Sequence, residues 1–451
     1  MRSTVRWVES LMASAALLIG VGWAPAGAAM PRTGVPVVGC DRAAATIVLT
    51  ASADLDPACT YSGGIEITRS HVTLDCQGAH VDQGEGRSGV GILITTDVDT
   101  ALSDITVRNC VVHGFLDGMR ITRVGFRTLA EGHEYEHDYA RVHLVDDQVS
   151  GTGGVGIYVD GYVTGVGIRH VTITDAGSTG IYLETGSKGT RVLDSTIEHN
   201  GYANTDPAGS PYVVGGVTFL YVSTGREGIA VDGSQDNLIL DNVIRDNSYG
   251  GVLLYQNCGE HYTTDRADWL PRRTPASGNR IEDNTIADEP NGVWIGSRMA
   301  ENLVVWDCST PPYDTTGGAY HVLDHAPANA VVHNTFVGDT YGVRVEDDDN
   351  VVRRNRFEDA TGPTSAPPPV AAVLVGTEFR TTTLGEPVTG TVVADNASHL
   401  GGVTQPYAVI WGDTNTTFTG NRSNRRSVAA LGAGVQPTIE PLCMVVRFWL
   451  P

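Results

Sequence analysis

The sequence contains few basic residues. Its 451 residues include 30 lysines and arginines against 52 aspartates and glutamates, and the formal net charge at pH 7 is −22. Nucleic-acid binding depends on neutralising phosphates with Lys and Arg, so this balance argues against a nucleic-acid partner. It also disfavours attachment to an anionic membrane surface. A polyanionic substrate is less strongly disfavoured, because a local basic groove or a bound cation can override the global charge.

Long apolar runs are scarce as well. The stretch Leu11 to Val21 is too short to span a bilayer, and no later stretch is longer. It follows Arg2 and Arg6 and precedes the small residues Ala26 to Ala28. This order is typical of a cleaved secretory signal. We therefore expect residues 1–29 to be a signal peptide and the mature chain to be secreted or periplasmic, without membrane insertion.

Cysteine is sparse, with seven residues. In an exported chain such cysteines predict disulfides with one thiol left over. Two lie close together before the repeats, two follow equivalent strands, and two open long insertions. The favoured pairs are Cys40 with Cys59, Cys76 with Cys110, and Cys258 with Cys308, which leaves Cys443 unpaired; the sequence does not prove this connectivity.

What the sequence does contain is a short repeated phrase: glycine, an apolar residue, any residue, an apolar residue. Two pairs of copies are separated by 24 and 23 residues, and the copies begin at Gly118, Gly156, Gly180, Gly228, Gly251, Gly292 and Gly342. A repeat this short cannot bury its own apolar face, so it must stack on its neighbours. The phrase predicts an all-β fold, a single-stranded right-handed parallel β-helix (a solenoid) with long loop insertions.

A second phrase, Asn-x-(Ile/Phe), returns between the copies at Asn242, Asn284, Asn334 and Asn355. In stacked coils, equivalent asparagines hydrogen-bond to the turn backbone and to each other. We therefore interpret them as a structural ladder and not as ligands. Ser195 lies in the same register.

Most of the chain after the signal reads as one repeat domain. We expect an N-terminal cap region at 30–62, the β-helix at 63–430 and a C-terminal tail or cap at 431–451. Elsewhere the spacing of the phrase roughly doubles, which predicts loops that leave the coil. Such loops commonly carry binding functions, and here they would be 123–153, 201–226, 257–278 and 299–328.

The alternation also predicts which side chains leave the core. If the apolar residues of the phrase point inward, the residues between and after them point outward on one sheet. This outward set mixes aromatic rings with carboxylates, and we expect it to form one exposed strip: Arg120, Tyr158, Asp160, Tyr182, Glu184, Asp232, Tyr255, Trp294, Arg344 and Glu346. Sugars stack on aromatic rings and their hydroxyls need polar partners. The strip therefore predicts a polysaccharide or oligosaccharide partner; alternatively, these side chains only cover a sheet face.

Three carboxylates lie at the centre of this strip. Asp160, Glu184 and Asp232 should stack on successive coils, with neighbours about 5 Å apart and the outer two about 10 Å apart. The first separation matches a retaining glycosidase pair and the second approaches an inverting pair. Together with Glu260 they are the candidate catalytic residues. The candidate substrate-binding residues are Tyr158, Tyr182, Arg226, Glu227, Tyr255, Trp294, Arg298, Arg344 and His137, and no metal ligand is assigned.

One stretch matches a zinc-peptidase signature. Residues His133 to His137 read H-E-x-x-H, which needs both histidines on one helical turn. The stretch follows Gly132 inside a β-repeat protein, so we expect a loop beside the strip. Such a loop could offer His137 or Asp138 to a substrate or a cation.

The repeat pattern resembles the right-handed parallel β-helix proteins of the pectate-lyase-like superfold over roughly residues 40–425, especially its secreted branch that binds or hydrolyses sugars. The segments Arg226 to Asp232, Asn257 to Glu260 and Trp306 to Cys308 are similar to those of exported bacterial β-helix proteins. The resemblance implies the fold but no single reaction. The sequence lacks the Asp-Pro-His-(Asp/Glu) motif of mannuronan C5-epimerases. Pectate lyases use clustered Asp for Ca²⁺, and Asp347 to Asp349 is such a candidate, although an acidic turn explains it better.

Three functions follow from these patterns. The favoured one is a glycoside hydrolase that uses two of the four carboxylates and requires no cofactor, because the strip is rich in acids and poor in Lys. The second is a polysaccharide lyase or C5-epimerase on a polyuronate, in which Ca²⁺ could neutralise the substrate carboxylate. The third is a non-catalytic carbohydrate-binding or cell-surface protein. The sequence gives no indication of the oligomeric state.

Overall fold

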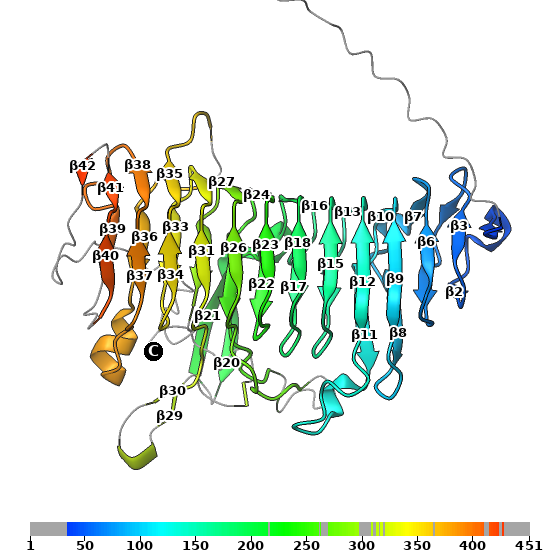
Figure 1. Ribbon diagram of the computed structural model, residues 1–451, viewed down its shortest axis with the longest axis horizontal. Coiled ribbons are helices and arrows are strands. Elements are labelled where there is room, and N and C mark those ends of the chain that lie inside the picture. Colours follow the sequence, from blue (N-terminus) through cyan, green and yellow to red (C-terminus); the bar gives the residue numbers. More distant parts are fainter. Residues whose placement is uncertain are drawn as a thin grey trace, which may run out of the picture.

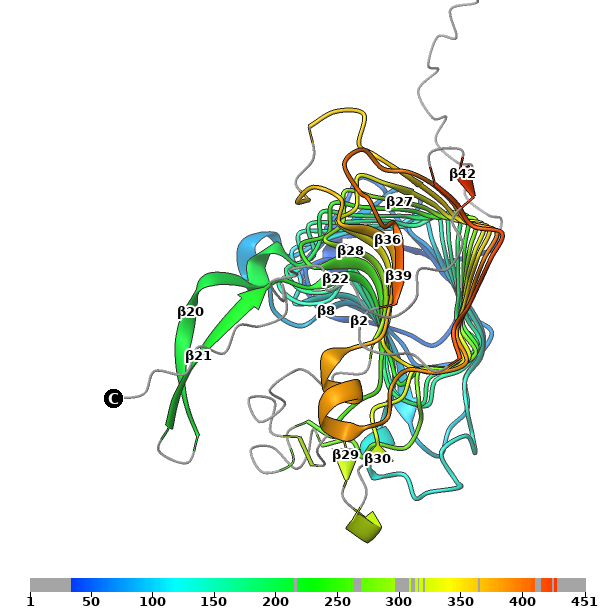
Figure 2. The same cartoon turned by 90° about the vertical axis from the view of Figure 1, so that its left-hand side faces the viewer.

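The computed structural model describes residues 34–214, 217–260, 262, 269–296, 308–309, 313–314, 316–318, 321–363, 366–409, 415–423 and 426–427. The expected signal peptide and C-terminal tail lie outside these residues. The chain winds as a coil that adds a strand to each of three sheets in every turn, and the sheets run along the whole length of the molecule (Figure 1, Figure 2). The predicted right-handed parallel β-helix is confirmed. No helix in the described part of the chain is long and apolar enough to cross a membrane.

Sheet 1 has 13 strands: β1 (Val37–Val38), β3 (Ala53–Leu55), β6 (Thr73–Asp75), β9 (Ser103–Arg108), β12 (Ala140–Val145), β15 (Val166–Arg169), β18 (Arg191–Leu193), β23 (Leu238–Leu240), β26 (Arg280–Glu282), β31 (Ala330–Val332), β34 (Val351–Arg353), β37 (Val392–Ala394) and β40 (Thr417–Thr419). Sheet 2 also has 13: β4 (Thr60–Tyr61), β7 (His80–Asp82), β10 (Val111–His113), β13 (Gln148–Ser150), β16 (Thr172–Thr174), β19 (Thr196–Glu198), β24 (Val243–Arg245), β27 (Thr285–Ala287), β32 (Thr335–Val337), β35 (Arg356–Glu358), β38 (Ala397–His399), β41 (Arg422–Ser423) and β42 (Arg426–Ser427).

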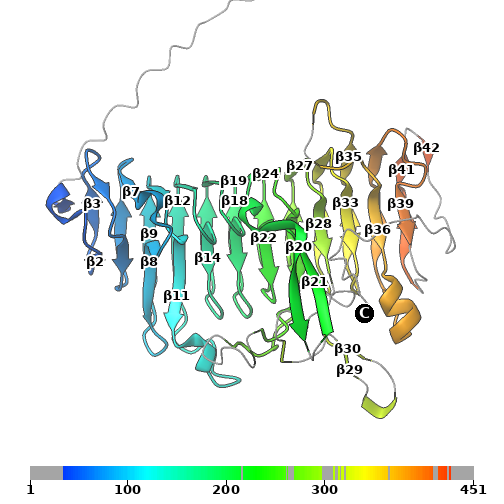
Figure 3. The same cartoon turned by 180° about the vertical axis from the view of Figure 1, so that it is seen from behind.

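Sheet 3 carries the repeated glycine phrase and has 12 strands: β2 (Ile47–Leu49), β5 (Ile65–Ile67), β8 (Val90–Asp97), β11 (Asp117–Val124), β14 (Ile157–Val159), β17 (Ile181–Leu183), β22 (Glu227–Asp232), β25 (Gly250–Tyr255), β28 (Asn291–Ile295), β33 (Tyr341–Val345), β36 (Ala371–Val375) and β39 (Tyr407–Val409). The order of its strands along the coil axis can be followed in Figure 3. Its inward side chains, such as Ile157 and Val159, are fully buried. The inward apolar residues of all three sheets form one continuous core.

The glycine of the phrase is required by the close stacking of coils. A Cβ atom on Gly156 would lie 2.5 Å from the carbonyl oxygen of Gly180, and one on Gly180 would lie 2.6 Å from that of Gly228. Any side chain at these positions would push neighbouring coils apart. The repeat therefore records a packing contact between successive turns.

The predicted asparagine ladder is confirmed between sheets 1 and 2. The Asn242 amide donates to Asn284 Oδ1 at 2.9 Å, and Asn284 donates in the same way to Asn334. Ser195 continues the ladder, since its backbone N–H donates to Asn242 Oδ1. Two further ladders were not predicted. One joins sheets 3 and 1 through Asn237, Asn279, Asn329 and Asn350, and the other joins sheets 2 and 3 through Asn200, Asn247, Glu289 and Asp339.

The three predicted disulfides are present: Cys40–Cys59, Cys76–Cys110 and Cys258–Cys308. Cys443 lies outside the described residues. The third disulfide joins the starts of two insertions that leave neighbouring coils. It therefore fixes these insertions relative to each other.

The insertions differ in part from the expected loops. Only about half of 123–153 leaves the coil, because β12 and β13 return to the sheets. The segment 201–226 forms η4 (Tyr202–Asn204) and an antiparallel hairpin of β20 (Thr205–Val214) and β21 (Val217–Thr224), which stands away from the coil on the side of sheet 3 (Figure 2).

The remaining insertions gather at the lower edge of the coil in Figure 1, where sheet 3 strands end. They carry η3 (Phe126–Thr128), the hairpin of β29 (Tyr313–Asp314) and β30 (His321–Val322), η7 (Thr316–Gly318) and the π-helix η8 (Phe379–Leu384). Short helices η1 (Cys40–Arg42) and η2 (Gly84–Gly86) lie nearer the N-terminus.

Candidate functional site

The outer face of sheet 3 carries the predicted strip in the expected register. The strand pairing aligns Arg120 with Tyr158, Tyr158 with Tyr182, and Tyr182 with Ala230. Further along the axis the same column continues with Leu253, Trp294 and Arg344. Asp160 and Glu184 follow the last residues of β14 and β17, and Asp232 ends β22 in line with Tyr255. The three carboxylates therefore lie at the same edge of the sheet on successive coils.

The expectation that this strip is exposed is wrong. Trp294 is 3% exposed, Tyr255 6%, Glu184 6%, Asp232 2% and Asp160 0%. The physical reason within the strip is that neighbouring coils place these side chains against one another. Tyr158 and Tyr182 have ring centroids 5.0 Å apart, and the Arg120 guanidinium lies 4.5 Å from the Tyr158 ring centroid. Both tyrosines remain half-buried, so this end of the strip is the more open one.

Tyrosine hydroxyls bind the carboxylates from one coil to the next. Tyr158 donates to Glu184 Oε2 at 2.7 Å, and Tyr182 donates to Asp232 Oδ2 at 2.7 Å. Burial and the adjacent carboxylates raise the pKa of both tyrosines well above the usual value. The two hydroxyls therefore keep their protons and remain donors at neutral pH.

Asp160 and Glu184 lie in different electrostatic surroundings. Arg120 donates from Nε and Nη2 to the two Asp160 oxygens at 3.0 Å each, and its Nη1 also contacts Asp117 Oδ2 at 3.3 Å. Both oxygens of Asp160 are therefore held by one guanidinium in a bidentate pair. Glu184 accepts from Tyr158 and from the backbone N–H of Thr185. Burial raises the pKa of Glu184 and the nearby Asp160 carboxylate adds to this, while the Tyr158 hydrogen bond and Arg127 oppose it.

Arg226, Glu227 and Glu260 form a group beside these carboxylates. Tyr255 donates to Glu227 Oε1 at 2.8 Å, and Glu227 is 2% exposed. Burial by itself lowers the pKa of Arg226. The negative charges of Glu227 and Glu260 outweigh this effect, so the pKa of Arg226 is raised above its usual value. The structure therefore brings these predicted residues together, with Arg226 held as a cation among acids.

Trp294 and Arg344 lie at the far end of the strip. The Arg344 guanidinium is 5.7 Å from the Trp294 ring centroid, donates to Asn291 Oδ1 at 3.1 Å, and pairs with Glu346. Trp294 packs with Tyr255, Leu253 and Ala230 in an apolar cluster outside the solenoid core. Within the described residues, the buried Trp294 Nε1–H has no hydrogen-bond partner.

The H-E-x-x-H stretch is not helical. Residues 134–137 lie in a turn and His137 has a φ of 61°. His133 contacts Glu136 at 2.8 Å, and the buried Glu134 binds Arg273 at 2.8 Å. The glutamate is thus a structural anchor, and His137 is exposed on the loop. Arg298 lies outside the described residues.

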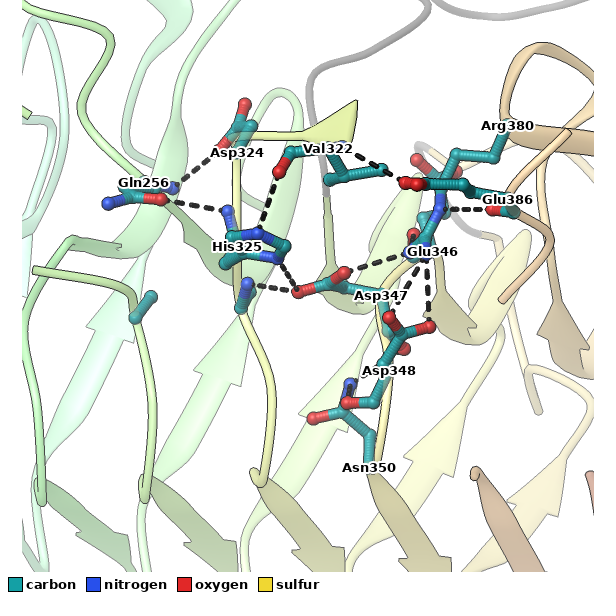
Figure 4. Close-up of polar contacts among 12 residues, drawn as sticks. Gln256, Val322, Asp324, His325, Glu346, Asp347, Asp348, Asn350, Arg380 and Glu386 are labelled. Atoms are coloured by element: carbon teal, nitrogen blue, oxygen red, sulfur yellow. Dashed lines mark hydrogen bonds and ion pairs between the residues drawn. The ribbon is translucent and has the colours of Figure 1, made fainter. Parts of the chain in front are cut away.

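A buried polar network that the sequence analysis missed joins two insertions (Figure 4). Arg380 from η8 binds Asp347 at 2.8 Å and Asp348 at 3.0 Å. His325 from the neighbouring insertion lies with Nδ1 3.7 Å from Asp347 Oδ2, and its Nε2 is 2.9 Å from the Val322 carbonyl oxygen. The sequence offers Asp347 to Asp349 as a Ca²⁺ candidate that an acidic turn explains better; in the structure Arg380 holds Asp347 and Asp348. No local sequence signal pairs them with Arg380, which lies more than thirty residues away.

The same network reaches the strip. The backbone N–H of His325 donates to Gln256 Oε1 at 2.9 Å, and the backbone N–H of Gln256 donates to Oδ1 of the fully buried Asp324 at 3.1 Å. Gln256 directly follows Tyr255. The network therefore lies next to the coils that carry Tyr255 and Arg344.

Two family models match the chain. The model described as "Right handed beta helix region" matches residues 58–266, and the model described as "Periplasmic copper-binding protein (NosD)" matches residues 214–351. Both matches fall on coils of the three sheets. Neither covers half of the chain.

The second description names copper, and copper sites use imidazole and sulfur ligands. In the described part of 214–351 both cysteines form a disulfide, and His325 is directed at Asp347 and the Val322 carbonyl. The three-donor group found there is Glu282, Asp283 and His333, and Arg280 already binds Glu282. These residues do not fit a resident copper site.

Solved structures resemble the chain at the level of the fold. They include the DFA-IIIase of Arthrobacter chlorophenolicus A6 without its lid (TM-score 0.50, 12% identity, covering 86% of this chain and 89% of that one) and the A-module of the mannuronan C-5 epimerase AlgE4 of Azotobacter vinelandii (TM-score 0.44, 15% identity, 88% and 94%). The catalytic domain of a GH87 alpha-1,3-glucanase has a TM-score of 0.48 at 11% identity and covers 86% of this chain and 63% of that one. The comparison with curated proteins gives no match. The family model and the three continuous parallel sheets identify the chain as a right-handed parallel β-helix protein.

Proposed function

We propose that the outer face of sheet 3 is the active site of a glycoside hydrolase. The observation that carries this proposal is the staggered arrangement of two tyrosines and two carboxylates, Tyr158 on Glu184 and Tyr182 on Asp232, each at 2.7 Å. It places two acids, each bound by a tyrosine of the preceding coil, on neighbouring coils, about 5 Å apart by strand spacing. That separation suits a retaining pair.

The electrostatics suggest which carboxylate plays which role. Burial raises the pKa of Glu184, so Glu184 keeps its proton more readily and is assigned as the general acid that protonates the glycosidic oxygen. Asp232 is assigned as the nucleophile that attacks the anomeric carbon as the bond to the leaving oxygen breaks. Asp160 is a positioning residue in this proposal because Arg120 already binds both of its oxygens.

The substrate is proposed to be a neutral glycan that enters at the half-buried Tyr158 and Tyr182 rings. A uronate would need a cation for its carboxylate, yet the described arginines of the strip lie against acids: Arg120 on Asp160, Arg226 beside Glu227, and Arg344 on Glu346. The overall charge of −22 also repels a polyanion. Tyr255 and Glu260 belong to the same site as further contacts.

A polysaccharide lyase or C5-epimerase is the second candidate. The observation that favours it is the Arg120 guanidinium 4.5 Å from the Tyr158 ring, because a tyrosine beside an arginine can transfer the C5 proton of a uronate. That reaction would draw on Ca²⁺ or another cation for the substrate carboxylate. A carbohydrate-binding protein without catalysis is the third candidate.

One experiment separates these functions. The full-length secreted protein is incubated with a panel of neutral and acidic polysaccharides, and reducing ends and the ultraviolet absorbance of unsaturated uronates are measured together. Reducing ends without that absorbance are expected. New absorbance would indicate elimination, a changed uronate composition without new ends would indicate epimerisation, and binding without any product would favour the third candidate.

Two variants test the assigned roles. Glu184→Gln is expected to abolish activity while the thermal midpoint stays nearly unchanged, since the amide can still accept from Tyr158. Asp175→Asn, an exposed acid on a different corner of the coil, is the matched control and should retain full activity. Full activity in Glu184→Gln would overturn the assignment of the general acid.

A further inference from the structure

Two carboxylic acids occupy amide positions in the ladder between sheets 2 and 3. Asn200 donates to Asn247 Oδ1 at 2.9 Å, and Asn247 donates in turn to Glu289 Oε1 at 2.8 Å. The backbone N–H of Glu289 then donates to Asp339 Oδ1 at 2.8 Å. Glu289 and Asp339 therefore continue the ladder that the asparagines begin.

A charged carboxylate cannot both accept and donate a hydrogen bond, as an asparagine amide does at a ladder position. In the ladder between sheets 1 and 2, Asn284 both accepts from Asn242 and donates to Asn334. An ionised Glu289 could accept from Asn247 but would have no proton to donate to the next coil. A protonated acid has both an acceptor oxygen and an O–H donor, so it reproduces the amide.

The surroundings of the pair also disfavour charge. Glu289 is 0% exposed and Asp339 is 5% exposed, and Asp339 Oδ2 is buried without a hydrogen-bond partner among the described residues. The charged groups that act on the pair from the same corner are Asp246 and Asp288, both acidic. Burial raises the pKa of each carboxyl well above its usual value, and the adjacent acids add to this.

We propose that Glu289 and Asp339 hold protons at neutral pH and form a proton-dependent joint between the coil of β28 and the coil of β33. The joint is independent of the proposed catalytic chemistry. It lies two residues before Asn291 and Tyr341, the first residues of strands that carry Trp294 and Arg344 on the outer face of sheet 3. Loss of the protons would place two charges in a buried ladder and loosen that end of the face.

The pH dependence of the joint has a definite sign. Each acid has a higher pKa in the folded protein than its ordinary value of 4.5 for Glu289 and 3.8 for Asp339. The stabilisation is therefore complete below these ordinary values and is lost as the pH rises through the folded pKa. The joint weakens in alkaline solution.

Infrared spectroscopy tests the proposal directly. The full chain is compared with Glu289→Gln, Asp339→Asn and the double variant at neutral pH, and with Asp175→Asn as an exposed control. The C=O stretch of protonated carboxylic acid is expected in the wild type, reduced in each single variant and lowest in the double variant. Asp175→Asn should leave the band unchanged.

A second measurement follows the joint itself. The thermal midpoint of the wild type should fall as the pH rises from neutral to alkaline, and the fall should be smaller in the amide variants. Backbone hydrogen exchange of 289–296 and 339–346, corrected for its intrinsic pH dependence, should lose protection over the same range in the wild type. The proposal is overturned if the wild type has no protonated-acid band at neutral pH, or if the variants leave both the band and the pH dependence unchanged. If the double variant does not fold, the loss of band intensity in each single variant relative to the wild type decides the matter, because Asp147 and Glu184 also contribute protonated acid to the wild-type band.

Discussion

The Tyr158 hydroxyl donates a 2.7 Å hydrogen bond to the carboxylate of Glu184 on the following coil. One coil further on, Tyr182 makes the same bond to Asp232. The strand spacing of a parallel sheet thus sets a tyrosine of one turn against an acid of the next. This geometry makes the protonation of Glu184 depend on a residue from another coil, which can be tested.

Replacing Tyr158 by Phe should shift the pH profile of the proposed hydrolase. The hydrogen bond from Tyr158 lowers the pKa of Glu184 against the raising effect of burial, so its loss raises that pKa further. If Glu184 donates a proton, the basic limb of kcat/KM moves to higher pH. The stability cost is about 1 kcal/mol for the lost bond. Tyr182→Phe, which removes the bond to Asp232 instead, is the control, and an equal upward shift in both variants would contradict the assignment.

Asp147→Asn should stabilise the protein above neutral pH. Asp147 is 1% exposed in the ladder between sheets 1 and 2, where its Oδ1 accepts from the Cys110 N–H at 2.9 Å. Burial raises its pKa to about 7, so the folded state loses stability as the pH rises from the ordinary value of 3.8 through this value.

An amide at position 147 removes this loss, worth about 1–3 kcal/mol for one buried polar group. Urea unfolding of both proteins from acidic to alkaline pH measures the difference. The curves should converge in acid and separate in alkali. The exposed neighbour Asp146 provides the control variant Asp146→Asn, and parallel curves at every pH would refute the prediction.

His325→Gln should loosen the network of Figure 4 only in acid. The Asp347 carboxylate, 3.7 Å from the His325 Nδ1, raises the pKa of His325 above 6.5 and outweighs burial. The stabilisation from the imidazolium is therefore complete below 6.5 and disappears as the pH rises through the folded pKa. Hydrogen exchange of residues 321–326 should be faster in the variant than in the wild type in acid, and equal in both in alkali. Equal exchange in acid would show that His325 does not hold this insertion.

Asn284→Ala should destabilise the coil strongly. The Asn284 amide accepts from Asn242 and donates to Asn334 Oδ1 and to the Ile239 carbonyl, each at 2.9 Å. Each buried partner left unsatisfied costs about 1–3 kcal/mol, so a loss of about 3 kcal/mol or more is expected in denaturant unfolding. Thr285→Ala changes the exposed next residue and should cost far less. Similar losses in both variants would argue against the ladder as a source of stability.

The sequence could predict features that repeat with the coil. The spacing of Gly156 and Gly180 and the alternation around Tyr158 and Tyr182 reflect contacts between equivalent positions of adjacent turns. The same logic predicted the ladder of Asn242 and Asn284. It could not reveal the ladder positions of Glu289 and Asp339, because acids at ladder positions do not match the asparagine phrase.

The alternation of the repeat could not predict how exposed the strip is. Alternation shows that Trp294 and Asp160 leave the core, but it does not show what they meet outside. Asp160 meets Arg120 of the preceding coil, and Trp294 packs against Tyr255 of the preceding coil. The binding of Arg380 to Asp347 joins an insertion to a coil turn. Such contacts depend on the paths of insertions, which have no period.

The sequence by itself determined the β-helix, the outward column of sheet 3 and one ladder, because each follows from a repeat whose copies must stack in register. It favoured the three disulfides without proving their connectivity. Only the tertiary structure decided that much of the column is buried, that tyrosines bind the acids of the next coil, and that His325, Asp347 and Arg380 form a network. These contacts join residues far apart in the chain. Their energies depend on burial and on the choice of partner, which arise only when coils and insertions are packed together.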